Sequence, residues 1–173
     1  SMTRRAIAAL VLLAACGGSS AERTVPTLSA SPRAGAAFGE LRTAFEHEPH
    51  DAKLVGRYRD FLRRFPDDRA SNLARLQLGH VLLDTQNVEG ARRELAAVPE
   101  PPPGNEHDFW LALRARLLRV DKKSDAALAI LQPLVGTVVD LPLRTVLLEE
   151  VAVASIDAKR SPEAVAYLAG WLR

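Results

Sequence analysis

Residues 72–103 carry a hydrophobic pattern with the period of an α-helix, interrupted once in the middle. On each side of the interruption most apolar residues lie three or four positions apart, which places them on one face of a helix. Polar residues 84–87 break the pattern, and the prolines of 99–103 end it because proline cannot continue a helix. The pattern predicts two short helices folded back on each other. Their apolar positions are Leu73, Leu76, Leu78, Val81, Leu82 and Leu83, followed by Ala91, Leu95, Ala96 and Val98.

Similar helix pairs are predicted on both sides of this one, over 34–65, 108–134 and 141–171. Leu54 precedes Ala91 by 37 positions, Ala126 follows it by 35, and Ala164 follows Ala126 by a further 38. The chain has 47% apolar residues but only 5% aromatic ones, and its many Leu and Ala residues favour helices over a sheet. We therefore expect an all-α domain of about four helix pairs.

The central pair resembles the tetratricopeptide repeat, a 34-residue unit. The resemblance lies in a large apolar residue beside a glycine, in small residues between the helices, and in a proline at the exit. It implies an α-solenoid of antiparallel helix pairs over residues 34–173, in which the paired helices approach closely at Gly79 and Ala91. The residues that carry it are Leu78, Gly79, Leu82, Ala91, Leu95, Val98 and Pro103.

The first 16 residues have the pattern of a secretory leader. After a tag-like Ser1 come Arg4, Arg5, and an apolar run over 6–15, which is too short for a permanent membrane span. Residues 13–16 (LAAC) resemble the lipobox of bacterial lipoproteins, which implies cleavage of signal peptide 1–15 and lipidation of Cys16. An ordinary leader that leaves a free cysteine is the alternative. By the same resemblance, Gly17 implies the outer membrane, with the domain facing the periplasm. The segment after Cys16 is rich in Ser, Ala, Gly and Pro and has no periodicity, so residues 16–33 are expected to form a flexible tether.

The charge balance bears on the class of partner, and the cysteine count bears on disulfide bonds. Removal of Arg4 and Arg5 with the leader reduces 23 basic residues to 21, which equals the number of acidic residues. Nucleic acid is therefore not an expected partner. A single cysteine excludes an intramolecular disulfide.

No catalytic or cofactor motif is found in the sequence. Phosphate-binding glycine loops, GxSxG, HExxH and paired cysteines are all missing, so we expect neither catalysis nor a cofactor. His47 and His50 lie among acids at a predicted turn, but the intervening Pro49 keeps the two rings off a shared helix face. A solvated turn is the preferred interpretation of that cluster, and no metal site is expected.

The tetratricopeptide resemblance implies a partner-binding groove lined by the first helix of each pair. The alternative is that many of these residues belong to the core, because one sequence leaves the helix register open. In the groove hypothesis, Arg119 and Glu149 orient the helix or extended segment of an envelope protein. The residues concerned are Leu76, His80, Leu83, Leu111, Ala115, Leu118, Arg119, Glu149, Val153 and Ile156.

These features together predict a membrane-anchored adaptor for envelope assembly. Residues 58–68 (YRDFLRRFPDD) resemble repeats of lipoproteins in outer-membrane protein assembly and of cell-division coordinators; pilotin-like lipoproteins share the plan. Because the chain stops inside an apolar helix at Arg173, we expect truncation, or packing of this end on another subunit. The alternative function is a docking domain of a larger lipoprotein, similar to penicillin-binding protein activators, whose C-terminal part is an enzyme or ligand receptor.

Overall fold

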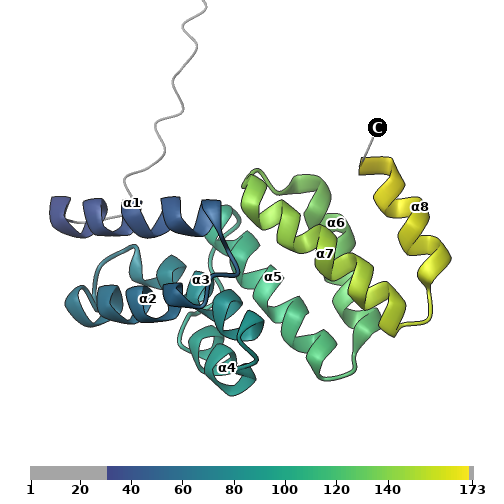
Figure 1. The fold of residues 1–173 in the computed structure, drawn as a ribbon, viewed down its shortest axis with the longest axis horizontal. Helices are drawn as coiled ribbons and strands as arrows, with labels where there is room; N and C mark the ends of the chain where they lie inside the picture. Colours follow the sequence, from purple (N-terminus) through teal and green to yellow (C-terminus); the bar gives the residue numbers. More distant parts are fainter. Residues whose placement is uncertain (1–30, 172–173) are drawn as a thin grey trace, which may run out of the picture.

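The computed structural model describes residues 31–171, which form eight α-helices and no strand (Figure 1). This confirms the all-α prediction. Cys16, the predicted leader and nearly all of the predicted tether lie outside the described residues. Within 31–171, none of the helices combines the length and apolar character that a membrane crossing requires. The helices are α1 (Pro32–His47), α2 (Lys53–Arg64), α3 (Ser71–Asp84), α4 (Val88–Ala96), α5 (Asn105–Val120), α6 (Ser124–Thr137), α7 (Leu141–Asp157) and α8 (Ser161–Trp171).

Short polar side chains begin three of these helices. Ser31 accepts a hydrogen bond from the Ala34 amide (3.1 Å), so α1 starts at Pro32, two residues before the expected start of the domain. Asn87 and Asp140 cap α4 and α7 in the same way, each accepting from the amide three residues ahead at 2.9 Å. Each cap satisfies an amide that has no partner within its helix.

The same turn joins the helices of the last three pairs. Gln86, Lys122 and Lys159 have φ of 62°, 63° and 59°, which is the left-handed region. In each turn the left-handed residue donates its amide to the carbonyl three positions back. The residue that follows the left-handed one donates its amide to the carbonyl five positions back. This is the Schellman motif, which here uses non-glycine residues. The turns recur at intervals of 36 and 37 residues.

The structure corrects two details of the sequence interpretation, the register of α6 and the helix that Gly79 contacts. Ala127, not Ala126, is buried in α6, and its spacings of 36 from Ala91 and 37 to Ala164 match those of the turns. At Gly79, a Cβ would meet the Leu113 side chain at 2.4 Å. The close approach therefore joins α3 to α5 of the next pair, rather than α3 to its own partner α4.

The first pair is built differently from the others. It holds four of the five phenylalanines of the chain, and two of its ring contacts join Phe38 to Phe61 (5.6 Å between centroids) and Phe61 to Phe65 (5.3 Å). At the end of α1, Phe45 packs on Phe109 of α5 (5.9 Å), and α1 also contacts α7. Figure 1 shows the C-terminal end of α1 directed towards the start of α7. The first pair thus reaches a helix almost 100 residues further along the chain.

Candidate interaction surface

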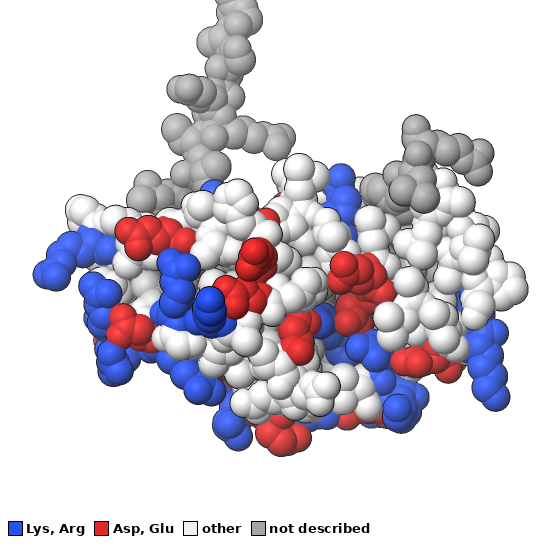
Figure 2. All heavy atoms as spheres, viewed as in Figure 1, with Lys and Arg blue, Asp and Glu red and all other residues white. Residues whose placement is uncertain are grey.

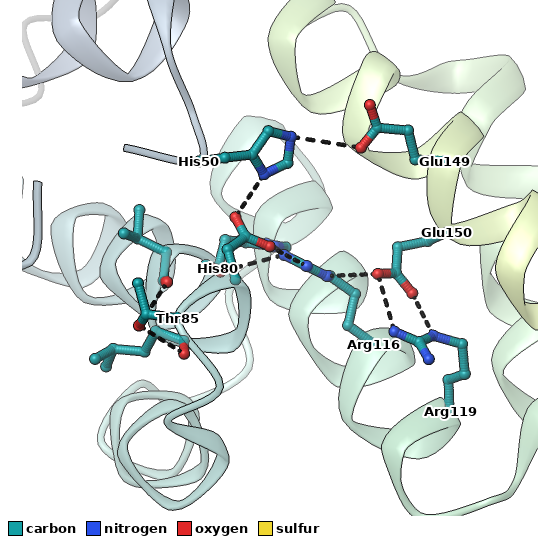
Figure 3. A network of polar contacts seen from close by, with 10 residues as sticks. His50, His80, Thr85, Arg116, Arg119, Glu149 and Glu150 are labelled. Carbon is teal, nitrogen blue, oxygen red and sulfur yellow. Dashed lines mark hydrogen bonds and ion pairs between the residues drawn. The ribbon is translucent and has the colours of Figure 1, made fainter. Parts of the chain in front are cut away.

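A buried guanidinium connects three of the odd-numbered helices. Arg116 of α5 donates from Nε to Glu150 Oε1 of α7 (3.0 Å) and from Nη2 to Asp84 Oδ1 of α3 (Figure 3). Its side chain is 7% exposed, and those of Asp84 and Glu150 are 12% and 8% exposed. A buried charge is tolerated when it is paired and fully hydrogen-bonded. Arg116 therefore fixes the relative positions of α3, α5 and α7.

His80 of α3 completes this cluster as a neutral base. Arg116 Nη1 donates to His80 Nδ1 (3.1 Å), which leaves Nε2 protonated and able to donate to the Phe109 carbonyl (3.3 Å). Burial, together with the nearby Arg116 charge, lowers the pKa of His80 to about 3. Its neutral form is thus the one that fits the structure.

The network extends to the surface in two directions. Arg119 donates from Nε to Glu150 Oε2 (2.7 Å), and Arg119 lies 3.5 Å from Asp157. These carboxylates, with Glu150 first, raise the pKa of the Arg119 guanidinium. On the other side, His50 lies between two carboxylates, 2.8 Å from Asp84 and 3.4 Å from Glu149. The turn between α1 and α2 is therefore attached to both α3 and α7.

The cluster has the composition of a structural network. No group of three or more His, Cys, Asp or Glu residues suitable for a metal ion occurs within the described range. The sequence analysis did not single out Arg116, Asp84 or Glu150. A repeat-based signal was nevertheless present, because Arg116 and Glu150 are 34 residues apart, as are His50 and Asp84.

Three residues predicted to line the groove are buried. Leu76 and Ala115 have no exposed surface, and His80 is 1% exposed. Their assignment to an accessible groove is therefore corrected: Leu76 and Ala115 belong to the core, and His80 to the Arg116 network. The helix period alone could not distinguish the inner face of these helices from an outer one.

Three further predicted residues are half-buried and do not share a surface with Arg116. Leu83 packs at the edge of the core near the end of α3. Leu111 and Leu118 are seven residues apart and hence share one face of α5, roughly opposite Arg116. Leu111 lies in a hollow beside α6, and Leu118 in a groove beside α4. The predicted set is thus divided over at least two faces of the molecule.

The remaining predicted residues do lie together. Glu149, Val153 and Ile156 are at positions i, i+4 and i+7 of α7, so they form one stripe along that helix. We call these three residues the α7 stripe. Val153 is 40% and Ile156 61% exposed, and the Glu149 side chain is 57% exposed. Arg119 adjoins this region through its contacts to Glu150 and Asp157.

The face of the molecule seen in Figure 2 has no large area in which all charged side chains have the same sign. Figure 2 shows acidic and basic side chains interspersed, with a mostly uncharged surface over α8, whose sequence contains one charged residue, Glu163. A mixed surface of this kind does not favour a polyanion as partner. Comparison with protein families, curated proteins and solved structures found no match to this chain.

Proposed function

We propose that this protein is a lipid-anchored adaptor of the bacterial outer membrane, with a tetratricopeptide-like solenoid that binds an envelope protein. Two observations support the repeat architecture: the same Schellman turn in three successive pairs, and the 36- and 37-residue spacing of those turns. The lipobox-like sequence at Cys16 supports the anchor. Without a catalytic motif in the sequence, binding is the function that these features favour.

The α7 stripe is the observation that carries the binding proposal. Two aliphatic side chains are exposed in helical register beside the Glu149 carboxylate, whose one ion-pair partner among residues 31–171 is His50. Such a surface suits a partner segment that presents aliphatic side chains and a basic group for Glu149.

The binding proposal is tested by affinity capture from detergent-solubilised envelopes with the full chain and two variants. Ile156→Glu places a charge in the stripe, and Leu141→Glu places the same charge at the other end of α7, on a side chain of similar exposure (67% against 61%). We expect a partner that the wild type and Leu141→Glu retain and Ile156→Glu loses, with helicity unchanged in both variants. Equal recovery by all three proteins would exclude the α7 stripe as the binding surface.

The anchor is tested separately in the native host. Metabolic labelling with a radioactive fatty acid should mark the wild-type chain, and Cys16→Ser should be unlabelled and released from the membrane fraction. Labelling of the serine variant, or an unlabelled wild type, would contradict lipidation at Cys16. This result is independent of partner capture.

A further inference from the structure

A second surface lies on the outer side of α5, away from the Arg116 network and the α7 stripe. It is a groove of about 330 Å³ between α4 and α5. Its floor is aliphatic and is formed by side chains from both helices. We call it the α4–α5 groove; its lining residues are Arg92, Leu95, Ala96, Arg114, Leu117, Leu118 and Asp121.

One end of the α4–α5 groove is closed by an ion pair. Arg92 donates to both carboxylate oxygens of Asp121, with Nη1 to Oδ2 at 3.2 Å, and lies 3.3 Å from Glu89. The Arg92 hydrogen bond lowers the pKa of Asp121, so this carboxylate is ionised at neutral pH. The charge of Arg92 is thus already neutralised within the protein.

Arg114, which lies on α5 seven residues before Asp121, is in a different situation. Its guanidinium carbon lies 5.5 Å from the centre of the Trp110 ring, and within residues 31–171 it forms no ion pair with a carboxylate. The Trp110 ring is itself fixed, because its Nε1–H donates to the Val98 carbonyl at 3.2 Å. The groove therefore combines an aliphatic floor with one positioned cation whose charge is not neutralised by an acid.

From this combination we propose that the α4–α5 groove binds an amphipathic helix of a partner protein that places a carboxylate against Arg114. Aliphatic side chains three and four positions apart on that helix cover Leu95, Leu117 and Leu118. The carboxylate forms a charge-assisted pair with Arg114. The nine residues of α4 span about 13 Å, which is the length of roughly two to three turns of a bound helix.

The hollow between α6 and the N-terminal half of α5, on the same face of α5 as the groove, serves as an internal comparison. It is of similar size, about 350 Å³, and is also partly apolar, being lined by Leu111, Ile130 and Leu134. Its titratable lining residues are His107, which pairs with Glu100 at 3.3 Å, and Asp108, and no arginine or lysine lines it. An acidic helix should therefore not favour this hollow.

The test uses a panel of short, fluorescently labelled model helices, each with a leucine stripe and one Glu at a different position beside it. Their binding to the full chain is measured by fluorescence anisotropy, with Lys in place of Glu in the matched peptides. We expect at least one Glu peptide to bind about tenfold more tightly than its Lys counterpart. Leu118→Glu should abolish this binding, and Leu111→Glu, seven residues away on the same helix face, should leave it unchanged.

Charge reversal gives the most direct result. Arg114→Glu should lose the Glu peptide and gain the Lys peptide, because the preference is set by this one side chain. Failure of every Glu peptide to bind, equal binding of the Lys peptides, or equal loss in the Leu111→Glu variant would overturn the proposal. Ile156→Glu should bind the peptides normally, so the outcome is independent of that for the α7 stripe.

Discussion

The first helix pair and the three that follow are attached to each other by different physical means. Pairs two to four share one backbone turn and are connected by the charged contacts of Arg116. The first pair has an irregular turn at Glu48, with φ of −142°, and adds the packing of the Phe45 ring to the two surface contacts of His50. Aromatic packing tolerates an irregular position, whereas a hydrogen-bonded ion pair requires exact geometry. The difference indicates that the first pair is a specialised end unit.

Phe45→Ala should have the largest effect and should separate the two regions. Phe45 is 1% exposed, so its truncation removes the aromatic contact and leaves a cavity that costs about 4 kcal/mol. Hydrogen exchange by mass spectrometry should show lost protection in α1 and α2 before α3 to α7. Uniform loss over all helices would mean that the first pair is not a separate unit.

Arg116→Ala tests the other mode of attachment. It leaves Asp84 and Glu150 without their main partner in a region of low exposure, so the free energy of unfolding should fall by about 3 kcal/mol. Arg114→Ala, on the opposite face of the same helix, should cost less than about 1 kcal/mol. Urea denaturation measures both, and a similar loss for the two variants would contradict the role of the network.

His80 gives the Arg116 network a pH dependence. Because its pKa is lowered to about 3 in the folded state, the unfolded chain binds one more proton between about pH 6.5 and pH 3. Stability contributed by His80 is thus complete above pH 6.5 and is lost as the pH falls, by up to about 1.4 kcal/mol per pH unit. His80→Gln, which keeps a donor for the Phe109 carbonyl, should have a correspondingly shallower slope between pH 6.5 and 4.5. Identical slopes would show that His80 does not titrate on unfolding.

Glycine substitution in the turns should give the smallest effect, with one sign at a left-handed position of the later pairs and the opposite sign in the first pair. Lys122→Gly relieves the cost of φ = 63° for a residue with a Cβ. Glycine also gives the unfolded chain more conformational entropy, which offsets part of this gain, so the net stabilisation should be about 0.5–1 kcal/mol. Glu48→Gly, at a φ that any residue can adopt, should destabilise it by about 0.5 kcal/mol. Thermal unfolding of the two variants should shift in opposite directions, and a shared direction would contradict this account of the turns.

The helical class and the approximate positions of the pairs were predictable, because hydrophobic period and helix-breaking residues act locally. The α6 register was placed one residue early, since Ala126 and Ala127 are adjacent and equally small. Gly79 was correctly marked as a close contact but was assigned to the wrong helix. Which two helices approach each other depends on packing between pairs, and a single hydrophobic period contains no information about that.

The candidate site was harder to predict than the fold. Arg114, Arg116 and Arg119 occur in one run of α5, yet one stacks on Trp110, one is buried, and one lies at the rim. Their environments differ because the helix turns by about 100° per residue and meets different neighbours on each side. Only the three-dimensional positions of Asp84 and Glu150 identify Arg116 as the buried member.

The contact of α1 with α7 has a mechanical consequence. A row of stacked helix pairs with only neighbouring contacts behaves as a spring, whose curvature changes when a load is applied to its ends. Here the ring of Phe45 and the two bonds of His50 connect the first pair directly to α5, α3 and α7. Residues 31–157 therefore form a closed loop of contacts rather than an open coil. A pulling force on the N-terminal side would be transmitted across this loop to α7 without first uncoiling the pairs between them.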